Sequence, residues 1–542
     1  MNREAFMEAV SDESQVWDVL VVGGGATGLG IAVDAASRGY KVLLVEQSDF
    51  AKGTSSRSTK LVHGGVRYLA QGDVKLVFEA LRERGLLLKN APHLVRIQSF
   101  VIPAYSYFTK TFYGVGLTIY DIMAGRLRFR KTGLLSRDAV TRRLPSIKRK
   151  GLRGGVEYYD GQFDDARLAI NLAQTCADNG GVLLNYMSVV GLLKDSAGKV
   201  AGVKARDAES GRDYTLKSKV VINATGVFVD AVLQMDAPGQ HPLVRPSQGV
   251  HVVLDHSFLP GDSALMIPET PDGRVLFAVP WHAHVLVGTT DTPLDKSSLE
   301  PTASEQEIDF ILETAGAYLT KKPTRHDVLS VFAGLRPLAA PAQGTNSTKE
   351  ISRSHKLIVS PSGLVTITGG KWTTYRKMAE DTMDKAVAVG KLPPSSCVTA
   401  TLKIHGHEGG HADSGDAAPL AIYGSDALGL QDLVTERPEL GQRLHARFPS
   451  ICAEVVWAVR HEMARTIEDV LARRLRILFL DARAAIDMAP KVASVMAAER
   501  GLPLAWQQDQ VKRFIELANS YLLEPYRPAI QADMNLNQLN DI

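Results

Sequence analysis

Residues 18–46 have the sequence DVLVVGGGATGLGIAVDAASRGYKVLLVE. The run Asp18–Val22 is rich in β-branched residues and predicts a buried strand, and Lys41–Val45 predicts a second one. The small and apolar residues of Ala26–Arg38 predict a helix between them, which Gly39 ends. A strand, a helix and a further strand in this order are typical of a parallel sheet with helices packed on it, so the sequence indicates an α/β fold.

Three glycines separate the first strand from the helix. Gly23 permits a tight turn, Gly25 lets the backbone approach a pyrophosphate, and Gly28 lets the helix pack closely on the strand. The helix N-terminus adds free N–H groups, and the Glu46 carboxylate after the second strand can accept ribose hydroxyls and repel a 2′-phosphate. Rather than a glycine-rich turn without a ligand, we predict a dinucleotide site formed by Gly23, Gly25, Ala26, Thr27, Gly28, Glu46 and Gln47.

Two later strands also end in small residues. Lys219–Ile222 is followed by Asn223-Ala-Thr-Gly226, and Leu364–Ile367 is followed closely by Gly369-Gly370-Lys371. Glycines at strand ends far apart in the sequence suit a long cofactor that the backbone approaches from several sides. This pattern favours FAD over NAD, although each turn taken alone is compatible with an ordinary strand-to-loop connection.

The composition excludes several classes of protein. The 542 residues suffice for about three or four domains. With 45% hydrophobic and 22% charged residues, the chain has the balance of a globular rather than a disordered or fibrous protein. A net charge of +3 gives no general reason to expect nucleic acid as a partner. The three cysteines are too few and too scattered for a disulfide framework or a zinc site, so we expect no metal and a reducing compartment.

Residues 53–68 have the sequence GTSSRSTKLVHGGVRY. Hydroxyls, arginines, a lysine and a histidine stand here beside apolar residues, a combination that a solvated loop rarely has. Arg67 offers bidentate hydrogen bonds to a phosphate or a carboxylate, and His63 is the natural proton acceptor near neutral pH. The stretch therefore predicts a substrate site beside the cofactor.

These stretches resemble the FAD-dependent glycerol-3-phosphate dehydrogenases, the respiratory or aerobic enzymes within the glycine/D-amino-acid oxidase superfamily. The matching motifs are VVGGGATGLGIAVDAASRG, TSSRSTKLVHGGVRYL, FDDARL (Phe163–Leu168), NATG, FAGLRPL (Phe332–Leu338) and GGKWTTYRKMAE (Gly369–Glu380). The stretch His461–Ala485 is similar to the helical C-terminal domain of the family. The resemblance thus covers the chain from about Asp18 to about Ala485.

The resemblance implies oxidation of sn-glycerol 3-phosphate to dihydroxyacetone phosphate, with hydride transfer to FAD and electrons passed to a membrane quinone. This reaction needs a base for the hydroxyl proton and cations that hold the phosphate. The implied base is His63, with His251 as the second choice, and Arg336 completes the catalytic candidates. For His251 in the strand-like run Gln248–Val253 the alternative is a core role, and for Arg336 it is a structural salt bridge. The residues implied to surround the substrate are Arg67, Tyr68, Arg336, Arg353 and Lys371.

Two of these assignments carry qualifications from the sequence itself. Arg353 stands in the context ISRSHK, which departs from the family pattern, and Lys371 has an alternative role at the pyrimidine edge of the flavin. The resemblance also implies that Thr54, Ser55, Ser58, Lys60, Leu61 and His63 wrap around the flavin. It further places near the adenosine or the flavin ring Gly226, Gly370, Lys371, Thr373 and Thr374.

Two other enzymes of the same superfamily are alternatives. A glycerol-3-phosphate oxidase passes its electrons to oxygen, makes hydrogen peroxide and shares the same motifs. An amine or amino-acid oxidase also holds a substrate carboxylate with an arginine, but the several cationic residues and the HGGVRY stretch argue against it.

The segment 105–153 joins an aromatic stretch to a basic one. Tyr105–Met123 is aromatic and apolar, and the eleven Arg and Lys residues of 125–153 are opposed only by Asp138. Such a combination suits the headgroup layer of an anionic membrane, and the alternative is a solvated basic face beside a core helix. No run of apolar residues reaches the length of a membrane span, and Met1–Trp17 is too acidic for a signal or transit peptide. We therefore expect a cytoplasmic protein peripherally bound to the inner face of the cell membrane, with a homodimer as one alternative for its oligomeric state.

The expected architecture is a Rossmann-like FAD-binding domain interleaved with a mixed-sheet substrate (cap) domain, followed by an α-helical C-terminal domain. Within residues 1–400 we assign 16–90, 155–240 and 335–395 to FAD binding. The cap takes 91–154 and 241–334, a linker follows at 401–418, and the helical domain spans 419–542. Its predicted helices are Asp426–Leu433, Glu439–Ala446, Ile451–Ala464, Ile467–Leu478 and Asp481–Gly501.

Overall fold

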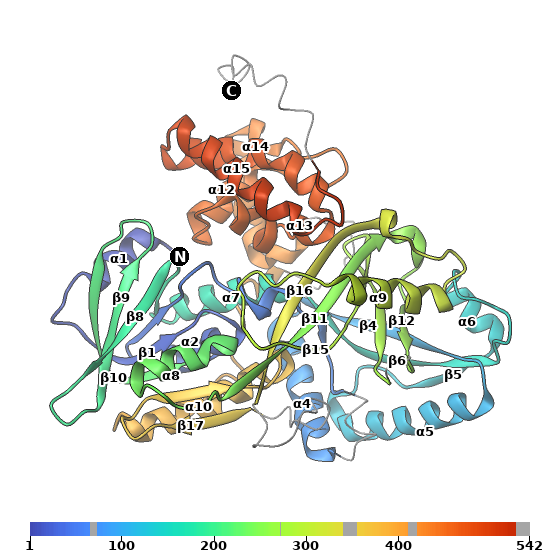
Figure 1. Cartoon of the computed structure of the whole chain (residues 1–542), viewed down its shortest axis with the longest axis horizontal. Coiled ribbons are helices and arrows are strands. Elements are labelled where there is room, and N and C mark those ends of the chain that lie inside the picture. The colour runs from blue at the N-terminus through green and yellow to red at the C-terminus, as the bar shows by residue number, and fades with distance from the viewer. Residues whose placement is uncertain (66–72, 271–272, 340–354, 410–419, 527–542) are drawn as a thin grey trace.

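The computed structural model describes residues 1–65, 73–270, 273–339, 355–409 and 420–526. Two sheets lie side by side, and the C-terminal helices sit above them (Figure 1). Arg67, Tyr68 and Arg353, three of the predicted substrate residues, lie outside the described ranges, as does the second half of the predicted linker.

The first sheet is the predicted α/β unit. Its central strand β1 (Val16–Val22) runs parallel to β2 (Val42–Val45) on one side and to β10 (Asp213–Asn223) on the other. The strand order is β17-β18-β10-β1-β2-β7, with the antiparallel pair β8 and β9 attached to β10. The remaining bounds are β7 Val182–Leu184, β8 Met187–Lys194, β9 Val200–Asp207, β17 Lys356–Val359 and β18 Val365–Thr368.

Three helices pack together on this sheet. The predicted helix is confirmed as α2 (Ala26–Ser37), which contacts α7 (Asp165–Asp178) and α10 (Tyr375–Val389). Their small and branched side chains are buried with those of β1 and β2 in one core. Burial of α2 on nearly every side explains its mostly apolar sequence, because a helix enclosed by other elements has no polar face. Its buried Asp34 is paired with Arg38.

The second sheet is mixed, as predicted. Its order is β15-β11-β14-β13-β12-β4-β6-β3, with β16 on β11 and β5 on β6. Most pairs are antiparallel, but β12 and β4 are parallel. The strands are β3 Leu61–Val62, β4 Val95–Ala104, β5 Gly133–Leu135, β6 Gly154–Phe163, β11 Val244–Asp255, β12 Ala264–Ile267, β13 Leu276–Trp281, β14 His284–Gly288, β15 Thr292–Pro293 and β16 Val328–Ala339. Their helical neighbours are α4 Val74–Asn90, α5 Tyr107–Ala124, α6 Arg137–Arg143 and α9 Glu305–Tyr318.

The chain passes between the two sheets several times. The first sheet takes strands from residues 16–45, 182–223 and 356–368, whereas the second takes strands from 61–163 and 244–339. The connections therefore run along the boundary between the sheets, where loops from distant parts of the sequence meet.

The C-terminal helices form a body whose apolar core continues onto the second sheet at Val253, Trp281, Leu286 and Phe332. It contains α11 Ala427–Glu436, α12 Cys452–His461, α13 Ile477–Leu480, α14 Ala482–Arg500 and α15 Leu504–Asn519. Within the described residues, no helix is both long and apolar enough to span a bilayer.

Two of the helices predicted in this region are wrong. Glu439–Ala446 forms only a short 3₁₀ turn at Pro438–Gly441, because Gln442 is extended and Arg443 pairs with Ile451 in a β-bridge. Ile467–Leu478 is not one helix either. Asp469–Arg474 is π-helical, and the left-handed conformation of Arg476 (φ 66°) separates it from α13.

His405 links the helical body to the first sheet's helices. Its Nδ1 lies 2.7 Å from Asp178 Oδ2, and its Nε2 lies 3.1 Å from Asp426 Oδ1. Burial lowers the pKa of His405, but the hydrogen bonds to the two carboxylates outweigh it and raise the pKa to about 9. The imidazolium is therefore the form that holds this junction together at neutral pH.

We expect His405→Gln to remove part of the pH dependence of stability. Because the folded pKa lies above the ordinary value of 6.5, the stabilisation is complete below about pH 6.5 and is lost as the pH rises through about 9. Solvent screening limits the effect to about 1 kcal/mol. Urea unfolding at pH 6 and at pH 9.5 measures it. His326→Gln is the control, since His326 is exposed and 3.9 Å from Glu524, and equal pH dependence in all three proteins would contradict the assignment.

Candidate active site

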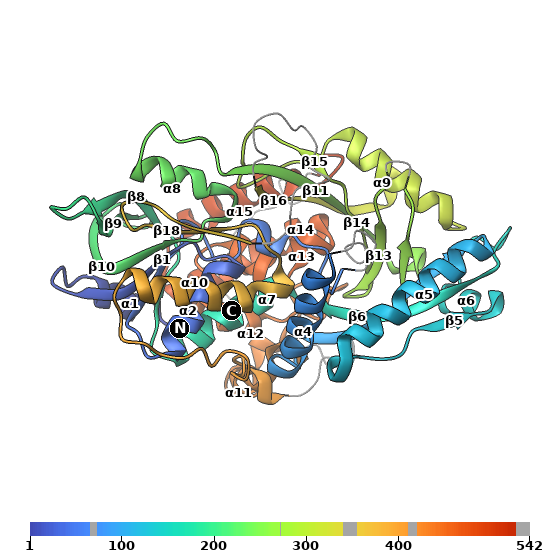
Figure 2. The ribbon, with the colours of Figure 1, turned by 90° about the horizontal axis from the view of Figure 1, so that it is seen from below.

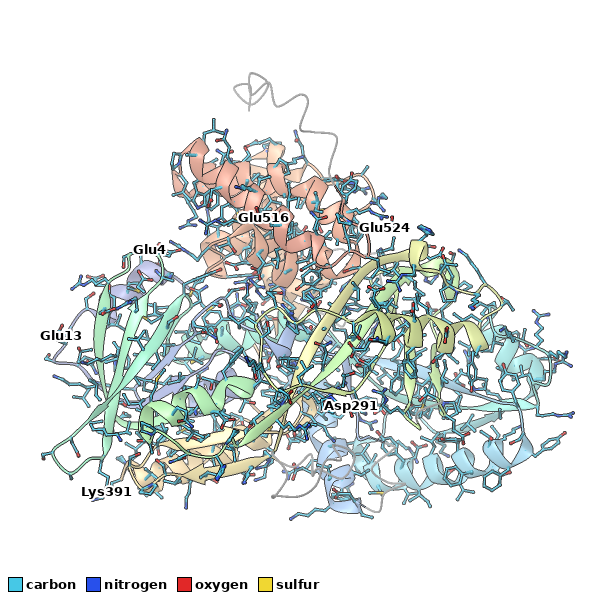
Figure 3. The ribbon with its side chains drawn as sticks, in the orientation of Figure 1. Glu4, Glu13, Asp291, Lys391, Glu516 and Glu524 are labelled. Carbon is cyan, nitrogen blue, oxygen red and sulfur yellow. The ribbon has the colours of Figure 1, made fainter. Side chains whose placement is uncertain are left out.

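Two cavities lie at the boundary between the sheets and join each other. The first encloses about 300 Å³ and the second about 330 Å³. Asp291, which lines the first, is labelled between the two sheets in Figure 3. The residues that line both cavities are Thr54, Pro337, Gly369, Gly370, Lys371 and Trp372. Together the cavities form one elongated site.

The glycine turn forms one wall of the second cavity. Gly23 has φ +111°, and a Cβ there would lie 2.7 Å from the Ala224 carbonyl oxygen. A Cβ on Gly28 would lie 1.8 Å from the Gly23 carbonyl oxygen, so the start of α2 rests directly on the end of β1. Gly25 caps α2 without a side chain, which leaves the first amides of the helix facing the cavity that Gly25, Ala26 and Thr27 line. A helix N-terminus in this position binds anions.

Glu46 and Gln47 line the same cavity. The Glu46 carboxylate accepts hydrogen bonds from the backbone amides of Gly24 (2.7 Å) and Ser48 (3.0 Å). Burial raises the pKa of Glu46, and these two hydrogen bonds oppose the rise. Each carboxylate oxygen keeps a second lone pair for a hydroxyl of a ligand.

The loop after Glu46 brings hydroxyls to the junction of the cavities. Thr54 lines both cavities and donates to the Leu335 carbonyl oxygen (2.6 Å), while Ser55 accepts from the Ala26 amide (2.9 Å). Ser58 and Leu61 line the first cavity. Gly226 lines the second, and Gly370 lines both.

The side chains of two residues predicted to bind the cofactor, Lys60 and Thr374, do not line either cavity. The Lys60 ammonium is fully buried, 2.7 Å from both Asp165 Oδ2 and the Ser56 carbonyl oxygen, and lines neither cavity. Burial lowers the pKa of Lys60 to about 7 against the opposing effect of Asp165. Thr374 also lies outside the cavities and donates to the Lys371 carbonyl oxygen, whereas Thr373 lines the first cavity. No pattern in the sequence pointed to the buried Asp165 that holds the Lys60 ammonium, and a role of Lys60 at the cofactor stays a prediction.

Both histidine candidates line the first cavity. His251 Nε2 lies 2.9 Å from Thr59 Oγ1, and its ring stacks on Phe332 with 5.1 Å between centroids. Burial, followed by the charges of Lys60 and Arg336, holds the pKa of His251 well below its ordinary value, so its imidazole is neutral. The backbone of His63 is fixed by the hydroxyl of Thr373, which accepts from its amide (3.1 Å).

Arg336 projects into the first cavity from β16. Its guanidinium donates to Asp291 Oδ1 (3.1 Å), to Thr289 Oγ1 (3.1 Å) and to the carbonyl oxygens of Thr290 (3.0 Å) and Gln248 (3.3 Å). These contacts fix the plane of the guanidinium, and Asp291 balances part of its charge. A positioned guanidinium of this kind binds the oxygens of a phosphate or a carboxylate.

The structure adds lining residues that the sequence analysis missed. Arg274 lines the first cavity and lies over the Phe310 ring, 5.2 Å from its centroid. Asp291 contacts Arg336, and Thr59 contacts His251. Asp291 belongs to the polar run Thr289-Thr290-Asp291 directly after the apolar strand β14, and polar residues at a strand end were the available signal. No comparable signal marks Arg274.

Lys371 lies where the cavities meet and lines both. The two residues before it, Gly369 (φ +80°) and Gly370 (φ +76°), are left-handed, and a Cβ on Gly370 would lie 2.2 Å from Met378 Sδ. This turn sends Lys371 towards the junction from the end of β18. The Lys371 ammonium can therefore lie beside the ring of a ligand that extends through both cavities.

Two family models match the chain. Residues 18–376 match the family described as FAD dependent oxidoreductase, and residues 365–511 match the family described as the C-terminal domain of alpha-glycerophosphate oxidase. The cavities fit FAD, because the glycines, the helix N-terminus and Glu46 suit its nucleotide half and the Lys371 junction suits its ring. FAD is therefore the cofactor of this fold.

Relatives and solved structures agree with these matches. The mitochondrial glycerol-3-phosphate dehydrogenases of Arabidopsis thaliana and Rattus norvegicus are 40% and 41% identical, over 96% of this chain and 87% and 75% of theirs. The glycerol-3-phosphate dehydrogenase of Bacillus halodurans, complexed with FAD, aligns with a TM-score of 0.79 at 29% identity, covering 97% of this chain and 99% of its own. The L-alpha-glycerophosphate oxidase of Mycoplasma pneumoniae shares the fold over 71% of this chain and 96% of its own (TM-score 0.55, 18% identity).

We expect Gly28→Ala to destabilise the protein by about 3 kcal/mol and to release FAD, since the new Cβ would overlap the Gly23 carbonyl. Thermal unfolding and the flavin content of the purified protein measure both effects. Gly116→Ala on α5 is the matched control, because a Cβ there meets no atom within 4 Å. A Gly28→Ala protein with full flavin content would contradict this account of the turn.

Proposed function

Because the chain belongs to the FAD-dependent glycerol-3-phosphate dehydrogenase family, we propose that it oxidises sn-glycerol 3-phosphate to dihydroxyacetone phosphate and passes the electrons to a membrane quinone. The observation that carries this proposal is the first cavity. It places Arg336, His63 and His251 around one space that opens at Lys371 into the cofactor cavity.

Several side chains of the first cavity have a chemical part in this proposed reaction. Arg336 binds the phosphate, held in position by Asp291 and by the carbonyls of the neighbouring loop. A phosphate makes charge-assisted hydrogen bonds to Arg336 that free glycerol cannot make, which discriminates against free glycerol. FAD supplies the hydride acceptor when it is bound, and Lys371 lies where a positive charge would favour the reduced flavin.

The hydroxyl proton needs a base, for which His63 is our choice over His251. Burial and two neighbouring cations keep the pKa of His251 well below its ordinary value, which makes it a weak proton acceptor. The hydrogen bond between His251 and Thr59 instead suits it to orient the substrate in the cavity.

The test is the anaerobic reaction of the purified flavoprotein with sn-glycerol 3-phosphate. Bleaching of the flavin absorbance, reversed by a soluble quinone much faster than by air, is the expected result. Fast reversal by air with hydrogen peroxide would make the protein an oxidase. Failure of this substrate to bleach the flavin would refute the proposal.

Arg336→Gln tests the phosphate site. We expect kcat/KM for sn-glycerol 3-phosphate to fall about 10- to 100-fold, since a charge-assisted hydrogen bond is lost, mainly through a higher KM. The matched comparison is the same variant with unphosphorylated glycerol, for which the rate should hardly change. Equal losses with both substrates would assign Arg336 a structural role.

The proposed membrane surface is the outer side of α5. The side chains of Tyr107, Phe108, Phe112, Val115, Ile119 and Ile122 are exposed, between 46% and 78%. The basic residues that follow α5 are also exposed. Val74 (54%) and Phe78 (58%) extend the apolar surface onto α4, which contacts α5 and faces the same side (Figure 2). An apolar surface beside exposed cations is typical of a protein that lies on an anionic bilayer.

This surface connects to the first cavity. Tyr120 of α5 accepts the amide hydrogen of Gly64 (2.7 Å) and donates to Asp160, which lines the cavity (2.9 Å). An electron acceptor dissolved in the bilayer would therefore approach the side of the protein on which Asp160 lines the first cavity.

We expect Phe108→Asp to weaken binding to vesicles that contain phosphatidylglycerol about tenfold or more, because an exposed phenyl ring can no longer enter the bilayer. Sedimentation with the vesicles measures binding, and reduction of a soluble dye by sn-glycerol 3-phosphate should be unchanged. Leu504→Asp is the control, since this 44%-exposed residue begins α15 on the opposite side of the molecule (Figure 1). Equal binding of the two variants would refute α5 as the membrane surface.

A further inference from the structure

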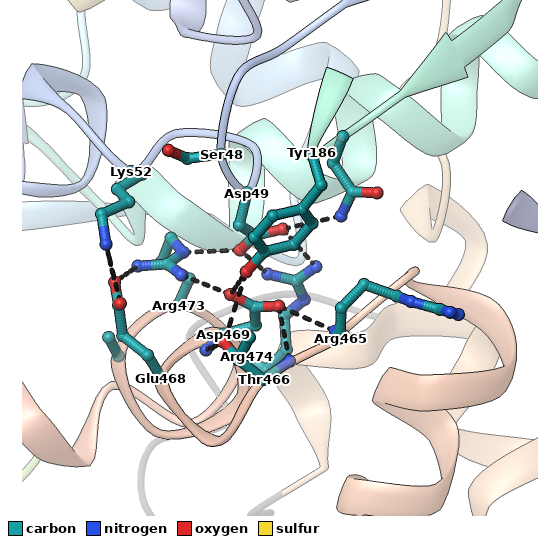
Figure 4. A network of polar contacts seen from close by, with 12 residues as sticks. Ser48, Asp49, Lys52, Tyr186, Arg465, Thr466, Glu468, Asp469, Arg473 and Arg474 are labelled. Atoms are coloured by element: carbon teal, nitrogen blue, oxygen red, sulfur yellow. Dashed lines mark hydrogen bonds and ion pairs between the residues drawn. The ribbon is translucent and has the colours of Figure 1, made fainter. Parts of the chain in front are cut away.

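The C-terminal body touches the cofactor site through a buried network of charges (Figure 4). The residues of the C-terminal body in this network are named the arginine clasp, which we define as Glu468, Asp469, Arg473, Arg474 and Arg476. The clasp faces the cofactor loop, which we define as residues 46–56, the segment between β2 and β3 that lines the second cavity. The two segments are more than four hundred residues apart in sequence.

Asp49 is the centre of the contact. Its Oδ2 lies 2.5 Å from both Arg473 Nε and Arg474 Nη1, and its Oδ1 accepts from Arg474 Nη2 at 3.0 Å. All three side chains are buried. Burial would raise the pKa of Asp49, but the two guanidinium groups outweigh it and hold that pKa below its ordinary value. The carboxylate is thus ionised, although it lies three residues after Glu46.

A second contact lies at the other end of the loop. Lys52 Nζ donates to Glu468 Oε2 at 2.7 Å, and Glu468 also accepts from Arg473 at 2.7 Å. Lys52 itself lines the second cavity. Arg476 adds a third contact by donating to the Ser56 carbonyl oxygen (3.1 Å).

The backbone of the clasp explains how neighbouring arginines reach one loop. Asp469–Arg474 is π-helical, and Arg476 is left-handed. A π-helix changes the angular spacing of consecutive side chains and is often found at functional sites. Here it directs Arg473 and Arg474 to the same carboxylate, which the 100° step of a regular α-helix would not do as readily.

We propose that the arginine clasp positions the cofactor loop, and that the C-terminal body thereby sets the affinity of the protein for FAD. Glu468, Arg473, Arg474 and Arg476 are positioning residues, since they act through Asp49, Lys52 and Ser56 rather than on the cofactor. The inference deepens the proposed function because it concerns the same cofactor site, but it requires only that FAD binds there.

The pair Lys52–Glu468 offers the cleanest test. Both side chains are slightly exposed, 17% and 18%, whereas removal of Arg473 or Arg474 would take one of two cations from the buried Asp49 carboxylate and endanger folding. We expect Glu468→Gln to raise the dissociation constant for FAD about tenfold, since the loop loses one of its fixed points. Titration of the apoprotein with FAD, followed by the quenching of flavin fluorescence, measures it without any substrate.

Glu209→Gln is the matched control. Glu209 lies at the same junction and binds Arg465 of the C-terminal body at 2.7 Å, but it stands between β9 and β10, away from the cavities. Thermal unfolding of the apoproteins should show comparable destabilisation for both variants, while only Glu468→Gln weakens FAD binding. Equal FAD affinity of Glu468→Gln and the parent protein, or equal loss in Glu209→Gln, would overturn the proposal.

Two further measurements separate positioning from general destabilisation. Glu468→Asp, which keeps the charge, should recover most of the FAD affinity. Lys52→Met should also weaken FAD binding, and the double variant with Glu468→Gln should lose less than the sum of the two single variants, because Lys52 and Glu468 share a contact. With saturating FAD, KM for sn-glycerol 3-phosphate should stay at the parent value in Glu468→Gln, and a raised KM would contradict an effect confined to the cofactor loop.

Discussion

No side chain fits between the end of β1 and the start of α2, where Gly28 rests on the carbonyl of Gly23. This contact fixes the direction in which the first amides of α2 point, and the cofactor cavity lies where they point. Strands β10 and β18 run parallel to β1, so their glycine-containing ends reach the same edge of the sheet. The walls of the second cavity therefore follow from one close approach of backbone to backbone and from strand direction.

The chemistry of the first cavity depends instead on charged and neutral side chains that are held in partly buried positions. The guanidinium of Arg336 donates to Asp291, to Thr289 and to two backbone carbonyls, and these contacts hold it at the wall of the cavity, where it can bind an anion. His251 stays neutral because burial disfavours its cation. Phe332, on which His251 stacks, packs against Phe479 of the C-terminal body with 4.9 Å between centroids. The C-terminal body thus packs behind His251, which lines the first cavity.

Elements that depend on neighbouring residues could be predicted from the sequence, whereas contacts with residues far along the chain could not. β1, α2 and β2 follow from β-branched runs, small residues and glycine spacing, and the structure has all three. Lys60 was assigned to the cofactor, but a buried Asp165, a hundred residues away, takes its ammonium. The helix predicted over Ile467–Leu478 is interrupted for the same reason. The conformation of Arg476 is stabilised by Asp165 and by the Ser56 carbonyl, which no local pattern reveals.

The interleaving of the two sheets has a consequence for synthesis of the chain. β18 is hydrogen-bonded to β10, and α10 packs on α2, yet both follow the whole second sheet in sequence. A nascent chain on the ribosome cannot complete its nucleotide-binding sheet until nearly four hundred residues have emerged. Until then the apolar faces of β1 and α2 lack part of their cover, and such non-local pairing is slow. Growing chains of this protein therefore depend on protection from aggregation for most of their translation.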